Sequence, residues 1–130
     1  MITFDWTMED DEPAYGSQPM LPDGKHVAKI AYVKCKTADW CKGERNPDGS
    51  YLLLGLDVTG HARVWDSIPI NRKARVQAVC LAAKVPLPTP DAEWDELTLL
   101  DEYVTINSEL RTSSKSNKEY VAIRSYDARQ

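Results

Sequence analysis

The sequence predicts an all-β domain of five strands with one helix, placed between the third and the fourth strand. Three observations point to this class. Short segments rich in Val, Ile, Leu and Tyr alternate apolar and polar residues, the period of a strand with one buried face. One later segment has apolar residues at helical spacing instead. The length of 130 residues and the 42% hydrophobic content suit one domain with its own core.

The first segment, residues 1–23, contains six acidic residues and no Lys or Arg. It is rich in proline and shows neither strand nor helix periodicity, so we interpret it as a flexible acidic arm before a domain of residues 24–130. Phe4 and Trp6 lie among the acids. The arm is therefore also a candidate for packing on the domain, or for docking onto a replication or host protein.

The first three strands follow the arm. Residues 26–36 predict a long curved strand that serves two packing partners, and residues 37–50 have the composition of an exposed loop. Residues 51–59 alternate cleanly, with their even-numbered leucines on one face. A tight hairpin signal at residues 59–61 leads into a third strand over residues 62–68.

The helix is predicted over residues 71–84, with Asn71 as its cap. Its buried stripe consists of Val76, Val79, Cys80 and Ala83. Basic residues crowd its first turn, where the helix dipole disfavours cations, and this hints at an external anion. These residues are Arg72, Lys73 and Arg75.

The last third of the chain begins with residues 86–100, which are acidic and proline-rich, with at most one helical turn around residues 91–96. Residues 103–108 and 120–126 predict the last two strands, and residues 111–118 between them predict a polar loop.

Charge is unevenly distributed along the chain. The formal net charge of −4 conceals a basic block, residues 24–84, with a net charge of +6, and an acidic block, residues 85–110, with −7. The last twenty residues have a net charge of +3. Local potential rather than the total attracts a polyanion, so the basic blocks are compatible with a nucleic-acid partner.

Metal binding and catalysis are poorly supported. Cys35, Cys41 and Cys80, with two histidines, lack the spacing of a zinc site, and we expect neither a metal nor another cofactor. Asp57, His61 and Asp66 lie near one hairpin and suggest a relay in a small hydrolase. Asp66 has the opposite strand parity, however, and no catalytic motif is present, so we expect no enzyme.

The cellular setting is predicted from the low number of cysteines and from the lack of long apolar segments. Three cysteines do not form a disulfide framework, which favours a reducing cytoplasm. The first twenty residues have no apolar segment typical of a secretory signal, and no run of about 18 apolar residues predicts a membrane span. We therefore expect a cytoplasmic protein with no membrane partner.

Exposed aromatic and basic residues form the most informative pattern. Unpaired bases stack on flat aromatic side chains while cations follow the phosphates, so this combination is typical of single-stranded nucleic-acid binding. The outward face of the second and third strands offers Tyr51, Arg63 and Trp65. The two loops add Trp40, Lys42, Arg45, Arg111, Lys115 and Lys118. A structural interpretation, in which Trp65 is half-buried under the acidic linker or the arm, stays open.

Four stretches, together with this strand order, carry a resemblance to a known family. They are Leu-Pro-Asp-Gly at residues 21–24, Tyr-Leu-Leu-Leu at 51–54, Ala-Val-Cys-Leu-Ala-Ala at 78–83 and Leu-Asp-Glu-Tyr-Val at 100–104. The chain resembles phage-encoded single-stranded-DNA-binding proteins with the oligonucleotide/oligosaccharide-binding (OB) fold, a five-stranded barrel. The likeness spans residues 21–126 and implies cooperative coating of exposed DNA in replication and recombination.

The chain departs from that family at its end. Many members finish in an acidic, aromatic-tipped tail that recruits replication partners, whereas this chain ends in Asp-Ala-Arg-Gln. The segment with acids and aromatics is the first one instead. Either the arm has taken over that role or partner recruitment is absent.

The aromatic and basic residues predict a nucleic-acid-binding protein without catalytic activity, and the resemblance implies that it is a viral DNA-binding protein. We expect it to bind single-stranded DNA without sequence preference during bacteriophage DNA replication and recombination, in the cytoplasm of the host bacterium. RNA is left open as a ligand, because stacking does not discriminate the 2′-hydroxyl. The alternative is a protein-interaction adaptor that uses the same barrel face and binds no nucleic acid.

Overall fold

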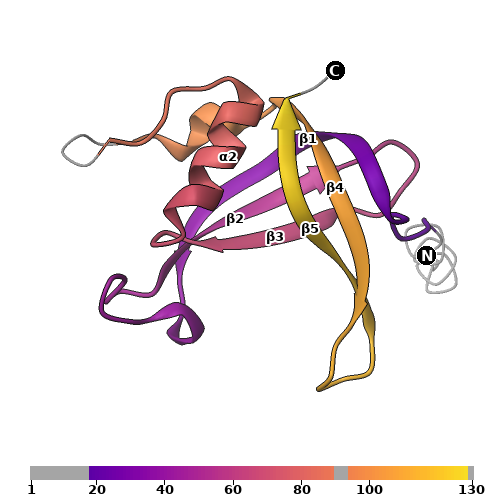
Figure 1. Ribbon diagram of the computed structural model, residues 1–130, viewed down its shortest axis with the longest axis horizontal. Coiled ribbons are helices and arrows are strands. Elements are labelled where there is room, and N and C mark those ends of the chain that lie inside the picture. Colours follow the sequence, from indigo (N-terminus) through magenta and orange to yellow (C-terminus); the bar gives the residue numbers. More distant parts are fainter. Residues whose placement is uncertain (1–17, 90–93, 129–130) are drawn as a thin grey trace, which may run out of the picture.

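The computed structural model describes residues 18–89 and 94–128. Its strands are β1 (Gly24–Thr37), β2 (Ser50–Asp57), β3 (Val64–Pro69), β4 (Tyr103–Thr112) and β5 (Glu119–Ala128). Its helix is α2 (Lys73–Ala83), and two short 3-10 turns are η1 (Asp39–Cys41) and η2 (Glu96–Leu99). Figure 1 shows the strands curling around one side of α2. No helix in these residues is long and apolar enough to cross a membrane.

The five strands form one antiparallel sheet in the order β3-β2-β1-β4-β5. β1 is long enough to pair with β4 as far as Lys29 and then with β2 from Lys29 to Thr37. Its register shifts between Ile30 and Tyr32, where a bulge increases strand bending and twist. The predicted all-β class with one helix, and the predicted long strand with two partners, are confirmed. The described strands do not close the sheet, because no pairing joins β3 to β5.

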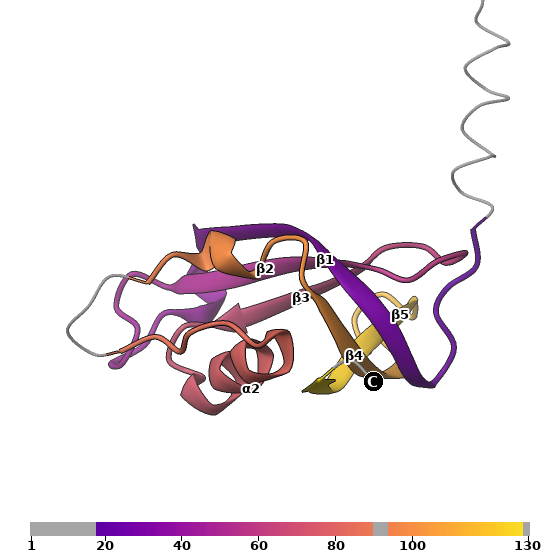
Figure 2. The same cartoon turned by 90° about the horizontal axis from the view of Figure 1, so that it is seen from above.

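The core lies between the curled sheet and α2. The even-numbered residues of β2, Leu52, Leu54 and Leu56, are buried as their alternation predicts. The predicted helix stripe, Val76, Val79, Cys80 and Ala83, is buried as well. α2 packs against β4 and β5, at the end of the sheet where β5 is the unpaired edge strand (Figures 1 and 2).

Several predicted boundaries are wrong. Asn71 does not cap the helix: the N-cap is Arg72, without a side-chain cap, and its N–H donates to Pro69 O at 2.9 Å. The helical turn predicted around residues 91–96 falls partly outside the described residues. The described turn is η2, capped by Asp95, whose carboxylate accepts from Leu97 N at 2.9 Å. Asn71 lies instead in the turn that follows β3, and the hydrogen bond from Arg72 N to Pro69 O closes this turn.

The last strand pair is longer than predicted. β4 continues to Thr112, so Arg111 lies in a strand and pairs with Tyr120 rather than lying in a loop. Backbone pairing between β4 and β5 continues beyond the residues that alternate, so the alternation of apolar residues does not reveal where the two strands end.

Residues 18–23, at the end of the predicted arm, pack on the domain. Leu21 is buried in the core. Pro19 O accepts from Ala62 N at 2.9 Å, and Pro22 O accepts from Ser108 Oγ at 2.8 Å. The rest of the predicted arm, residues 1–17, lies outside the described residues.

A polar clasp joins the unpaired edges of the sheet, and we use this name for Asp66, Arg75, Ile123 and Tyr126. Asp66 on β3 is opposite Leu54, so its side chain points inward from the edge strand. Arg75 Nη2 from α2 donates to Asp66 Oδ2 at 3.0 Å and to Ile123 O on β5 at 2.6 Å. Tyr126 OH donates to the same Asp66 oxygen at 2.5 Å.

Charge and burial make the clasp a fixed element. Arg75 Cζ lies 5.7 Å from the centre of the Tyr126 ring. Burial and the adjacent Asp66 carboxylate raise the pKa of Tyr126 well above its ordinary value, so the phenol stays protonated and keeps donating. Side chains thus connect β3, α2 and β5 where backbone pairing does not.

Replacing Arg75 tests the clasp. We expect Arg75→Ala to lower the free energy of unfolding by about 2–3 kcal/mol, because Asp66 would keep a partly buried charge with one partner fewer. Arg124→Ala, an exposed arginine on β5, is the matched control and should change that free energy by less than about 0.5 kcal/mol. Urea unfolding measures both. Equal effects of the two substitutions would contradict the clasp.

Candidate functional site

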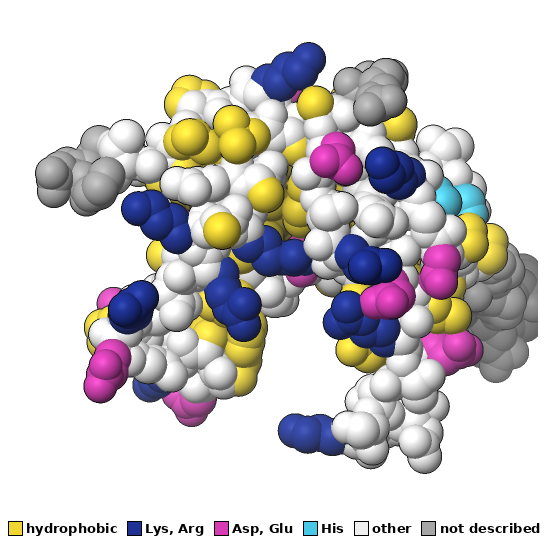
Figure 3. Space-filling model, viewed as in Figure 1, with side chains coloured by type: hydrophobic (Ala, Val, Ile, Leu, Met, Phe, Trp, Pro, Cys, Tyr) yellow, Lys and Arg dark blue, Asp and Glu magenta, His cyan; other side chains and the backbone are white. Residues whose placement is uncertain are grey.

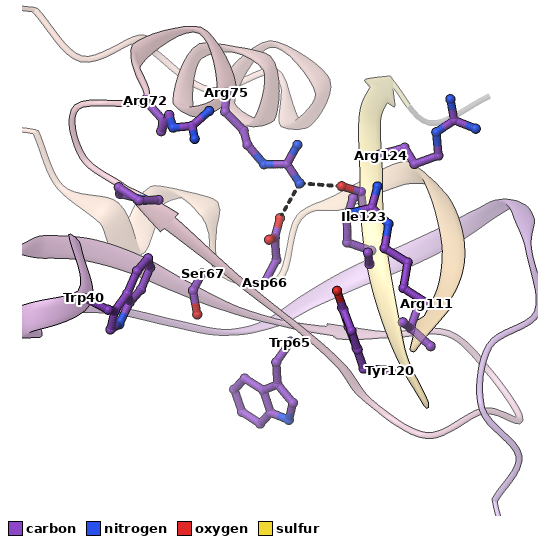
Figure 4. Close-up of a pocket in the computed structure, with 13 residues that line it drawn as sticks. Trp40, Trp65, Asp66, Ser67, Arg72, Arg75, Arg111, Tyr120, Ile123 and Arg124 are labelled. Atoms are coloured by element: carbon purple, nitrogen blue, oxygen red, sulfur yellow. Dashed lines mark hydrogen bonds and ion pairs between the residues drawn. The ribbon is translucent and has the colours of Figure 1, made fainter. Parts of the chain in front are cut away.

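A groove of about 540 Å³ lies where the sheet is not closed, between β3 and β5. Figure 3 shows it as a hollow between the β1–β2 loop and the β4–β5 hairpin. β3 contributes Trp65, Asp66, Ser67 and Pro69, and β5 contributes its segment from Tyr120 to Arg124. Trp40, Arg72, Arg75 and Arg111 complete the lining (Figure 4).

The groove is cationic. Arg72, Arg75, Arg111 and Arg124 line it, and Asp66 is the one carboxylate among its described lining residues. Asp66 is already bound by Arg75 and Tyr126, so it does not oppose an anion there as a free carboxylate would. Arginine presents a planar set of donors that suits phosphate, so the arrangement favours a polyanionic ligand.

Trp65 forms an exposed aromatic surface at the mouth of this groove. Its side chain is 49% exposed, and the edge of the ring meets Tyr32 with centroids 5.4 Å apart at 73°. Gly55 lies opposite both residues in the strand register. A Cβ at Gly55 would lie 2.9 Å from Tyr32 Cβ and 3.0 Å from Trp65 Cζ3. Glycine is therefore required for the two rings to pack over β2.

Trp40 forms a second aromatic surface, 60% exposed, on η1. Its ring centroid lies 5.2 Å from that of Tyr51. The loop that carries it is fixed by Asn46, whose buried amide donates to Cys41 O at 3.2 Å and Ser50 O at 2.8 Å. Gly49 has a φ of 67°, and a Cβ there would clash with Ala38 O. A glycine and one buried amide thus hold an exposed indole beside the groove.

The predicted site residues divide into two groups. Trp40, Trp65 and Arg111 line the groove, Tyr51 contacts Trp40, and Arg63 lies over Trp65 with Cζ 5.6 Å from the ring centre. The remaining predicted cations are exposed on the two flanking loops rather than in the groove, and they are Lys42, Arg45, Lys115 and Lys118.

Three of the predicted cations are held by carboxylates. Lys42 Nζ lies 3.0 Å from Asp39, and Arg63 Nε lies 2.6 Å from Asp57. Arg111 Nε lies 2.7 Å from Glu109. Hydrogen bonding to the carboxylate raises the pKa of Arg63 and that of Arg111. Each of these cations keeps a partner in the unliganded protein.

Sequence reasoning missed several residues of the groove, chiefly Tyr120 and Arg124 on β5. Their signal was present, since residues 120 and 124 have the strand parity opposite to Ile123, which is buried. The sequence places Arg72 only in a crowded first turn of the helix. Two of the three cations in that turn are accounted for, because Arg72 lines the groove and Arg75 is bound in the clasp.

The residues considered for catalysis have separate partners. Asp57 binds Arg63, Asp66 belongs to the clasp, and a ring nitrogen of His61 lies 3.1 Å from Thr59 O. The described residues include no group of three or more His, Cys, Asp or Glu that could hold a metal ion. All three cysteines are free thiols, and burial raises the pKa of Cys80.

No protein-family model and no curated protein matches this chain. Its function is therefore inferred from the groove itself: an open, cationic surface with two exposed indoles, set between two loops.

The Trp65 surface depends on Gly55, and a methyl group there tests it. We expect Gly55→Ala to lower the free energy of unfolding by about 1–3 kcal/mol through overpacking, and to change the tryptophan emission as Trp65 is displaced. At Gly43 a Cβ would meet nothing within 4 Å, so Gly43→Ala is the control and should stay within about 0.5 kcal/mol. A tolerated Gly55→Ala with unchanged emission would contradict this packing.

Proposed function

We propose that this protein binds single-stranded DNA without sequence preference and without catalysing a reaction. The observation that carries the proposal is the juxtaposition of exposed Trp40 and Trp65 with four arginines in one groove. Bases stack on the aromatic faces, and Arg72, Arg111 and Arg124 neutralise phosphates along the strand, while Arg75 stays bound in the clasp. A duplex hides the faces of its bases, so the aromatic surfaces favour single strands.

The OB fold is part of this proposal. An antiparallel sheet whose first strand pairs with two neighbours, and a helix after the third strand, support it. In that fold, oligonucleotides bind on the face of the second and third strands, between the loops that join the first two and the last two strands. Trp65 on β3, Trp40 in the first of these loops and Arg111 before the second occupy corresponding places.

The lack of sequence preference follows from the lining. Trp40, Trp65 and Tyr120 offer flat faces that every base can meet, and guanidinium groups recognise phosphate rather than base edges. The biological setting we propose is bacteriophage DNA replication and recombination in the host cytoplasm. The acidic first segment is the proposed contact for a replication or host protein.

A protein-interaction adaptor is the second candidate, and the open sheet favours it. β3 and β5 are both edge strands, and the groove runs between them. An extended acidic peptide would pair with such an edge through its backbone while the arginines bind its side chains. This reading does not require exposed indoles.

An oligonucleotide titration distinguishes the two functions. Oligo(dT) should quench tryptophan fluorescence, with an affinity that falls steeply as salt rises. Trp65→Ala should weaken binding by roughly 5- to 150-fold, the equivalent of about 1–3 kcal/mol for one stacked base. Trp94→Phe is the matched control, because Trp94 lies away from the groove against Pro86 and should leave the affinity unchanged.

The same titration with oligo(rU) and with duplex DNA measures preference for sugar and for strand state. Duplex should bind more weakly than dT. If dT at about 50 mM salt caused no quenching and no gel shift, that result would reject DNA binding and favour the adaptor.

The acidic first segment is expected to compete with DNA for the cationic groove. Residues 1–17 contain five acidic residues and no Lys or Arg, so their deletion should tighten DNA binding, most strongly at low salt where attraction is least screened. Replacing those five by their amides at full length should reproduce the effect. Unchanged affinity in both variants would show that the segment does not compete with DNA.

A further inference from the structure

We propose that Arg63 is a positioning residue that holds Trp65 as a preformed base-stacking surface, and that it does not bind a phosphate. This inference rests on the proposed DNA binding and assigns Arg63 a different role from the phosphate contact expected from the sequence. Three observations on the described residues support it: the geometry of its ion pair, its place over the indole, and the glycine beneath them.

Two nitrogens of the Arg63 guanidinium group bind Asp57. Nε donates to Asp57 Oδ1 at 2.6 Å and Nη2 donates to Oδ2 at 3.0 Å, so both carboxylate oxygens are engaged by parallel hydrogen bonds. Such bidentate pairing fixes the guanidinium plane. A phosphate would have to displace Asp57 from these donors. Asp57 is the last residue of β2 and Arg63 directly precedes β3, so the pairing of these two strands brings the two side chains together.

The fixed guanidinium lies against the indole. Arg63 Cζ is 5.6 Å from the centre of the Trp65 ring, within the range of a cation–π contact. Tyr32 meets the ring edge-on from β1. A Cβ at Gly55 would lie 3.2 Å from Arg63 Cδ, as well as 2.9 Å from Tyr32 Cβ and 3.0 Å from Trp65 Cζ3, so all three side chains converge over this glycine.

Trp65 is therefore restrained by neighbours while half of its surface stays exposed. A side chain already held in one conformation loses less conformational freedom when a base stacks on it, which strengthens binding. Lys42 and Arg111 also have carboxylate partners, but neither makes a cation–π contact within the described residues. Arg72 and Arg124 line the groove without an ion pair in the part of the chain described, and they suit phosphate.

Two substitutions distinguish a positioning role of Arg63 from a phosphate contact, because the two roles predict different changes in dT affinity. If Arg63 positions Trp65, Asp57→Asn should weaken dT binding although it removes a negative charge, because the guanidinium is released from its place. If Arg63 bound phosphate, the same substitution should tighten binding. Arg63→Ala should weaken binding by about 3- to 10-fold and reduce the maximum quenching at saturation.

The salt dependence provides an independent readout. Removing a phosphate contact lowers the slope of log K against log salt by about 0.7 for a single strand. We expect that change in Arg124→Ala and no change in Arg63→Ala. Arg63→Lys keeps the charge but not the bidentate geometry, so it should behave like Arg63→Ala. Urea unfolding checks that each variant is folded.

Tighter binding by Asp57→Asn, a slope reduced by about 0.7 in Arg63→Ala, or full affinity in Arg63→Lys would each overturn the positioning role. Failure of the proposed function is recognised separately, because the unsubstituted protein would then not bind dT at all.

Discussion

The connection between Asp66, Arg75 and β5 is the interaction on which the rest of the molecule depends. A curled antiparallel sheet of five strands has two free edges, and here β3 and β5 are not joined by backbone hydrogen bonds. Arg75 from α2 binds a carboxylate on β3 and a carbonyl on β5. One guanidinium therefore fixes the separation of the two edges and holds the helix between them.

The groove is a consequence of that separation. Had β3 and β5 paired directly, their backbones would occupy the gap between the two edges in which the groove now lies. The clasp instead binds Asp66 at the groove, and three further arginines, Arg72, Arg111 and Arg124, line the groove outside the clasp. Structural and proposed binding roles are thus divided among arginines of the same region. Arg75 serves the fold, whereas Arg72 and Arg124 remain available to an anion.

Each of the two aromatic surfaces depends on a glycine. Gly55 lets Trp65 and Tyr32 pack over β2, and Gly49 lets the backbone approach Ala38 closely in the loop that carries Trp40. Each indole is exposed yet has a defined neighbour, Tyr32 for one and Tyr51 for the other. A surface of this kind presents a flat face in a fixed direction, which is what stacking on an unpaired base requires.

The sequence by itself determined the β-rich class, the inward leucines of β2 and the buried stripe of α2, because burial on one face imposes a local period that can be read directly. It also indicated the outward Trp65 and the exposed Trp40. Only the tertiary structure decided the ends of β4 and β5, the packing of residues 18–23, and the meeting of Arg75 with Asp66 and Tyr126. These depend on pairing between residues far apart in the chain, as between Asp66 and Tyr126. Local alternation contains no information about which distant strand edge a side chain will reach.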